Sequence, residues 1–88
     1  MSQMPVKFRV VQAIYENEEL SNQEILEILK KEYPLDRSVS EKGVENCLLS
    51  LKASGMIELS HVTSDNKGKL KLSYKIMDYG ARRMNYII

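Results

Sequence analysis

The chain has 88 residues, 43% of them hydrophobic and 28% charged, which suits one small folded domain and argues against disorder. A lone cysteine and a lone histidine exclude an internal disulfide framework and fall short of a zinc site, and no apolar run approaches the roughly 20 residues of a membrane span. We therefore expect a single domain over residues 1–88 in a reducing, cytoplasmic setting, with no metal and no cofactor. The first residues lack the charged-then-apolar build-up of a signal peptide.

The net charge is only +1, but it is unevenly distributed. Residues 1–36 carry four Lys or Arg against seven acids, a balance of −3, and residues 37–88 carry nine against five, a balance of +4. A positive C-terminal half suits a face directed at phosphates. It is equally compatible with ordinary uneven surface charge.

A first helix is predicted from Pro5, which is well placed at a helix start because its missing N–H is not needed there. Apolar residues then recur at helical spacing through Ile14, and the helix is expected to end within residues 16–19. The apolar surface is broad enough for a core face with a dimer contact behind it, although core packing alone also explains it.

A second helix is predicted from the strongest local signal in the chain. Ser21 and Glu24 fit a capping box, and Leu20 and Ile25 fit the hydrophobic staple that accompanies it. Apolar residues continue at helical spacing as far as Leu29. The helix should end at residues 33–34, since a residue before proline is pushed out of helical geometry.

A third helix is predicted to follow the loop of residues 35–39, which we expect to be anchored to the core by Leu35 and Val39. Ser40 is the expected N-cap, and Ser38, paired with Glu41, is a rival. The inward stripe comprises Val44, Cys47, Leu48 and Leu51, and Gly55 is the expected left-handed residue after the helix. The outward face then carries Glu41, Lys42, Glu45, Asn46 and Ser50, with Gly43 allowing a close approach.

From Ile57 onward the sequence predicts a β-hairpin. Apolar residues alternate with polar ones from residue 57 to 62 and again from 70 to 76, and residues 64–68 between them have turn chemistry. Three lysines, Lys69, Lys71 and Lys75, should share the outer face of the hairpin. A turn and a short helix are expected near residues 77–84, before an apolar tail that would dock on the domain or on a partner.

Three helices followed by a basic hairpin resemble the winged helix-turn-helix domain of bacterial and archaeal transcription regulators. The residues that match the reading-helix pattern of that family are Ser40, Val44, Leu48, Leu51, Gly55 and Ile57. The segment 74–80 is similar to the closing strand of the family, Tyr-x-Leu-Thr-x-x-Gly, with Met77 in place of the threonine. The fold expected is α+β, a three-helix winged helix-turn-helix with a two-stranded wing and a short C-terminal helix.

The resemblance implies double-stranded DNA binding by a small transcriptional regulator, with the third helix in the major groove and the wing on the backbone. Base or phosphate contacts would come from Lys42 and Asn46, phosphate contacts from the two serines, and salt-dependent affinity from the wing. The full set of residues implied is Arg37, Ser40, Lys42, Gly43, Asn46, Ser50, Lys67, Lys69 and Lys71. Glu41 and Glu45 oppose phosphate binding, so a homodimer reading two half-sites is expected, with Tyr86, Ile87 and Ile88 as its contact.

The alternative hypothesis is a winged-helix module that binds a protein partner through the same helix and wing. The near-zero net charge and the two acids of the third helix favour it. An enzyme is not expected, because the sequence has no nucleophile elbow, phosphate-binding glycine loop or metal-ligand spacing.

Overall fold

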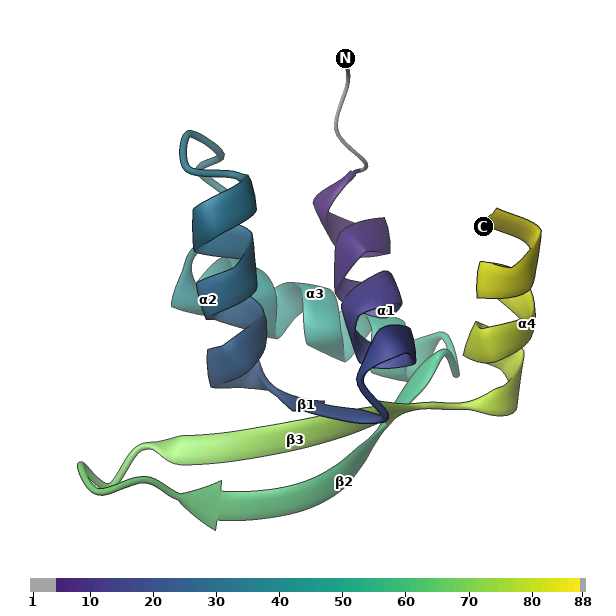
Figure 1. Cartoon of the computed structure of the whole chain (residues 1–88). Coiled ribbons are helices and arrows are strands. Elements are labelled where there is room, and N and C mark those ends of the chain that lie inside the picture. Colours follow the sequence, from purple (N-terminus) through teal and green to yellow (C-terminus); the bar gives the residue numbers. More distant parts are fainter. Residues whose placement is uncertain (1–4, 88) are drawn as a thin grey trace.

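Two helices stand side by side above a small antiparallel sheet, and a third crosses behind them (Figure 1). The computed structural model describes the backbone of residues 5–87 and the side chains of residues 5–83. The elements in chain order are α1 Val6–Glu16, β1 Glu19–Ser21, α2 Asn22–Glu32, α3 Glu41–Ala53, β2 Ile57–Ser64, β3 Leu70–Ile76 and α4 Asp78–Ile87. The β2–β3 hairpin extends to one side as a wing, and α4 stands at the opposite side.

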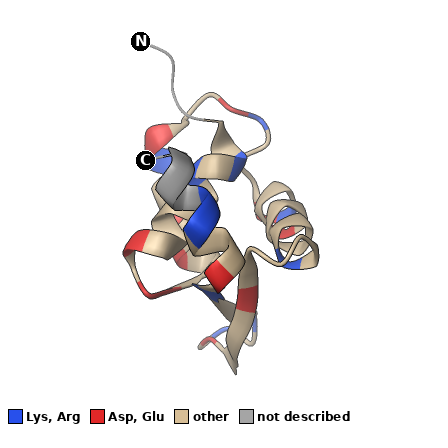
Figure 2. Cartoon of the chain, turned by 90° about the vertical axis from the view of Figure 1, so that its right-hand side faces the viewer, with Lys and Arg blue, Asp and Glu red and all other residues tan. Residues whose placement is uncertain are grey.

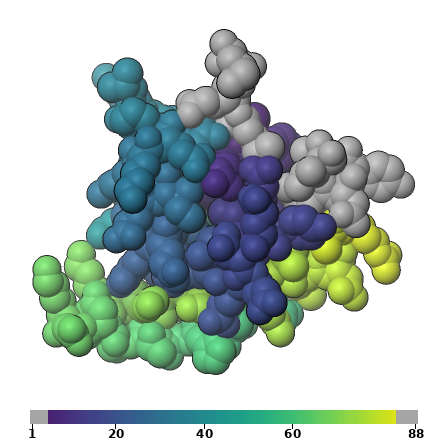
Figure 3. All heavy atoms as spheres, in the orientation of Figure 1, coloured from purple at the N-terminus to yellow at the C-terminus, as the bar shows by residue number. Residues whose placement is uncertain are grey.

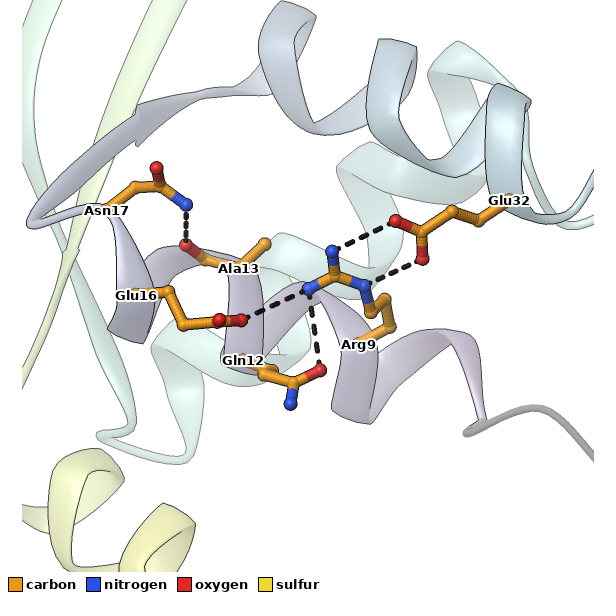
Figure 4. Close-up of polar contacts among 6 residues, drawn as sticks. All are labelled: Arg9, Gln12, Ala13, Glu16, Asn17 and Glu32. Atoms are coloured by element: carbon orange, nitrogen blue, oxygen red, sulfur yellow. Dashed lines mark hydrogen bonds and ion pairs between the residues drawn. The ribbon is translucent and has the colours of Figure 1, made fainter. Parts of the chain in front are cut away.

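Helix α1 ends where its acidic segment begins, as predicted. The Asn17 side chain donates to the carbonyl oxygen of Ala13 at 2.7 Å and so satisfies one of the last free carbonyl groups (Figure 4). Glu18 then adopts a left-handed conformation with φ 46°. This sharp turn brings the chain directly into β1.

The predicted start and end of α2 are confirmed. The Ser21 hydroxyl accepts from the backbone N–H of Glu24, and the Glu24 carboxylate accepts from the N–H of Ser21, both at 3.1 Å. Leu20 and Ile25, the staple residues, are both buried. The helix ends at Glu32, with Tyr33 as its C-cap.

The loop between α2 and α3 corrects one expectation and decides between the two candidate caps of α3. Leu35 is 95% exposed and does not anchor the loop, whereas Val39 packs against the core as expected. The carboxylate of Asp36 accepts from both the backbone N–H and the hydroxyl of Ser38, which holds Ser38 in a turn. The cap of α3 is therefore Ser40, whose hydroxyl accepts from the N–H of Gly43 at 3.0 Å.

The sheet has three strands rather than two, in the order β1-β3-β2. Leu20 of β1 pairs with Tyr74 of β3, so the short strand lies along the hairpin on the side away from β2. The sequence pattern does not predict β1, because the strand is only three residues long and its last residue, Ser21, carries a helix-cap signal. A register shift at Ser60 lets both Ser60 and His61 reach the Glu19 carboxylate, at 2.5 and 2.8 Å, which ties β1 to β2 across β3.

One buried cluster joins the helices to the sheet. Its members are Val10, Val11, Ala13, Ile14, Leu20, Ile25, Leu29, Tyr33, Val44, Leu48, Leu51, Ile57 and Tyr74. Gly55, with φ 77°, makes the left-handed turn from α3 into β2 that the sequence predicts. The start of α4 is held at this turn, because Met77 N–H donates to the carbonyl of Met56 at 3.0 Å and a Cβ on Gly80 would lie only 2.2 Å from the same oxygen.

Candidate nucleic-acid interface

Helix α3 presents a long face to solvent. In Figure 2 it is seen nearly end on at the right-hand side, apart from the other helices. Val44, Leu48 and Leu51 are buried, while Lys42 and Asn46 are exposed on the side of the helix away from this stripe. Both side chains implied for base contact are therefore accessible to a large partner.

Ser40 and Gly43 have structural roles at the start of α3. The Ser40 hydroxyl is engaged in the N-cap. A Cβ on Gly43 would lie 1.9 Å from the carbonyl oxygen of Ser38, so the absent side chain makes room for the incoming loop. The structure thus gives a packing reason for this glycine, where the sequence had indicated access for a ligand.

Ser50 lies next to a basic residue that the sequence did not single out. Lys7, in the first turn of α1, donates to the Ser50 hydroxyl at 2.9 Å and so adds a positive charge beside α3. The two residues are 43 positions apart, so only the tertiary structure reveals the contact. Lys7 therefore joins the candidate interface.

The wing touches α3 through an ion pair. The Lys69 ammonium lies 3.2 Å from the carboxylate of Glu41, in the first turn of α3, and both side chains are largely exposed. This contact places one wing lysine directly beside the helix. It also pairs the charge of that lysine with a carboxylate of the same molecule.

The wing loop is ordered by Asp65. Its carboxylate accepts from the backbone N–H groups of Lys69 and Lys67, at 2.9 and 2.8 Å, and these bonds lower the pKa of the carboxyl. Gln23 of α2 donates to the other carboxylate oxygen at 3.2 Å. The loop that carries Lys67 and Lys69 is therefore fastened to the start of α2, and the wing projects beneath that helix (Figure 3).

The lysines of the wing do not form one uniform row. Lys71 and Lys75 share a face of β3 by strand alternation, and Lys75 is paired with Glu58, directly opposite in register, at 3.0 Å. Lys69 precedes β3 and reaches α3 instead of joining that face. Arg37 lies in the α2–α3 loop at the far end of α2 from the wing (Figure 1), so it is not brought together with the wing lysines.

A cavity of about 240 Å³ lies between α2, α3 and β3. Its apolar lining comes from Leu26, Val44, Leu48, Leu70, Leu72 and Tyr74. The polar lining includes Glu41 and Glu45, and burial, followed by the charge of Glu45, raises the pKa of Tyr74. The acids of α3 thus line the cavity on the wing side.

Residues 5–83 contain no group of three or more His, Cys, Asp or Glu side chains arranged to hold a metal ion. None of the described helices is both long and apolar enough to cross a membrane.

Three helices, a β-hairpin wing and a short strand that pairs with it define a winged helix-turn-helix fold, as the sequence predicted. The sequence matches no protein-family model and none of the curated proteins. Solved structures of transcriptional regulators do match its fold.

A PadR-like transcriptional regulator of Bacillus cereus superposes with a TM-score of 0.70 at 21% identity, over 92% of this chain and 75% of that one. Bacillus subtilis PadR, solved in complex with operator DNA, gives 0.74 at 21% identity, over 94% of this chain but only 46% of PadR. A Thermoplasma acidophilum protein, described as a transcriptional regulator, gives 0.73 at 12% identity over 92% and 74% of the two chains. At these identities the similarity establishes the fold.

Proposed function

We propose that this protein binds double-stranded DNA as a small transcriptional regulator, with α3 in the major groove and the wing against the backbone. The observation that carries the proposal is the exposed face of α3, with Lys42 and Asn46 uncovered and the basic wing fastened beside the helix. Lysine and asparagine are residue types that pair with guanine and adenine edges in the major groove. The operator complex of Bacillus subtilis PadR, a protein with the same fold, supports the assignment.

The proposed contacts fall into two groups. Lys42 and Asn46 face the bases, while the hydroxyl groups of Ser40 and Ser50, on the same helix, donate to phosphates. Gly43 contributes by letting the α2–α3 loop pack against the start of the helix. Lys7, Arg37, Lys67, Lys69 and Lys71 supply charge around it. A protein with this role acts by binding rather than by catalysis, and in a prokaryotic cell it works in the cytoplasm.

The test is fluorescence anisotropy with a labelled random-sequence duplex at low and moderate salt. Binding should weaken steeply as salt rises, because lysine–phosphate contacts release counterions. The Lys69→Glu/Lys71→Glu double variant should bind much more weakly, whereas Lys30→Glu/Lys31→Glu, the same charge change on the exposed end of α2, should have a smaller effect. Unchanged binding by the wing variant would remove the wing from the interface.

The second candidate is a module that binds another protein, favoured by the cavity beside α3 with its apolar lining and acidic residues. The same titration separates the two functions. If the protein fails to bind DNA at micromolar concentration and low salt, the cavity and the exposed face of α3 would have to bind a polypeptide.

We also propose that the chain forms a homodimer through Tyr86, Ile87 and Ile88. The side chains of these residues lie outside the described part of the structure. Support comes from the place of α4 at the margin of the molecule (Figure 1), and from Phe8 of α1 and Tyr79 of α4, which are 43% and 53% exposed. Light scattering should give the mass of a dimer for the full chain and of a monomer after deletion of residues 86–88.

A further inference from the structure

The outermost stripe of α3 carries a single charged side chain. Successive residues of an α-helix are rotated by about 100°, which sets Lys42, Asn46, Leu49 and Ala53 on the side opposite the buried stripe. All four are exposed, and Leu49 is 53% exposed near the middle of the stripe. The part of α3 that would enter a groove first is therefore one lysine, one amide and two apolar side chains.

The acids of the helix lie along one edge of this stripe, and Glu45 is one turn before Leu49. Glu41 and Glu45 line the cavity on the wing side, and Glu41 is paired with Lys69. On the other side, Ser50 accepts from Lys7. The stripe itself carries no acid, and it is bordered by Glu41 and Glu45 on one side and by the Lys7–Ser50 contact on the other. Such a stripe suits the floor of the major groove, where base edges and methyl groups are exposed.

We propose that Leu49 is a specificity-determining residue that contacts the C5-methyl group of a thymine, next to the base read by Asn46. This inference rests on the proposed DNA-binding function. In the major groove the thymine methyl is the one apolar feature of the base edges, and an apolar side chain is its natural partner. Asn46 lies one turn before Leu49 and has an amide that pairs bidentately with adenine, so the DNA under the centre of α3 is an A·T-containing step.

The experiment begins with selection of preferred duplexes from a random pool by the full chain. Each thymine of the selected duplex is then replaced singly by deoxyuridine, which removes the methyl group and keeps the base pair. For the wild type, replacement of the thymine under Leu49 should weaken binding about fourfold, the value of one methyl group removed from water. Replacement of the other thymines should leave the affinity unchanged.

The Leu49→Ala and Leu49→Gln variants should bind the parent duplex several-fold more weakly and should no longer distinguish thymine from deoxyuridine at that position. Leu49→Met, which keeps a long apolar side chain, should retain the distinction. Leu35→Ala, a truncation at the 95% exposed leucine of the α2–α3 loop, is the matched control and should behave as wild type.

The outcomes separate this inference from the function on which it rests. The thymine contact is overturned if no deoxyuridine replacement weakens binding. It is also overturned if the replacement weakens binding by Leu49→Gln as much as it weakens binding by the wild type. Either result leaves DNA binding intact. Failure to bind any duplex at low salt overturns both. Circular dichroism of each variant verifies that the exposed substitution has left the helices folded.

Discussion

The guanidinium of Arg9 and the carboxylate of Glu32 meet through two parallel contacts, Nε to Oε1 at 2.7 Å and Nη2 to Oε2 at 2.9 Å (Figure 4). The pair joins the first half of α1 to the last residue of α2. Arg9 also lies 3.5 Å from Glu16 of its own helix, and its side chain is only 21% exposed. Hydrogen bonding to Arg9 lowers the pKa of the Glu32 carboxyl.

We expect Glu32→Gln to reduce the free energy of unfolding by about 0.5–1 kcal/mol at neutral pH, since the carboxylate is 39% exposed and the interaction is partly screened. Because the folded-state pKa of Glu32 lies below the unfolded one, this contribution is complete above the unfolded pKa and is lost as the pH falls through the folded value. Urea unfolding of both proteins at neutral and acidic pH should show the difference closing. Glu58→Gln, which breaks the more exposed pair with Lys75, is the comparison and should cost less. A Glu32→Gln deficit that persists at acidic pH would contradict the electrostatic origin.

Replacement of Gly43 by alanine should destabilise the protein. In an open helix position this change stabilises by about 1 kcal/mol. Here the new Cβ would lie 1.9 Å from the carbonyl oxygen of Ser38, so the loop must move and we expect a loss of about 1–3 kcal/mol. Thermal unfolding of this variant can be compared with that of Asn46→Ala, a substitution at an exposed position of the same helix. If Gly43→Ala were stabilising, the loop would have to move at little cost.

Removal of the Glu41 carboxylate should strengthen DNA binding. Glu41→Gln frees Lys69 from its pair at 3.2 Å and removes one negative charge from the proposed interface. We expect the affinity for random duplex to rise about three- to tenfold at low salt. The slope of log affinity against log salt concentration should steepen by the amount that corresponds to about one more phosphate contact. Glu27→Gln, the same change on the exposed face of α2, should leave both quantities close to wild type.

Replacement of Glu18 by glycine should stabilise the protein. A residue with a side chain pays roughly 1–2 kcal/mol to adopt the left-handed region, and Glu18 has φ 46°. Part of that gain is offset by the greater freedom of glycine in the unfolded chain, so we expect a net stabilisation of about 0.5 kcal/mol. Asn17→Gly, one residue earlier at φ −121°, should instead destabilise because it removes the bond to Ala13.

Local signals of the sequence predicted the helices well. The capping box of α2 and the Ser40 cap and Gly55 turn of α3 depend on residues a few positions apart, and all three are present in the structure. Leu35 was predicted wrongly because its apolar character says nothing of direction, and the turn around Asp36 directs it outward.

The arrangement of the candidate site depends on contacts between distant residues. Lys7 meets Ser50 across 43 positions and Lys69 meets Glu41 across 28, and no periodicity reports such a pairing. Strand β1 was missed because it is short and overlaps a cap signal, and because its partner in β3 lies more than 50 residues further along the chain. The contribution of each interface residue to DNA binding remains a prediction for the experiments above.

The three residues of β1 make the helices and the hairpin interdependent. Ser21 caps α2 while it pairs with Ser73, and Leu20 is buried opposite Tyr74. A fragment that ends before Ile57 would lose β3, the strand with which β1 pairs. The apolar faces of α1 and α2 would then be left open to water. The helices should therefore not survive as a free-standing three-helix peptide, and the chain should melt in a single cooperative step.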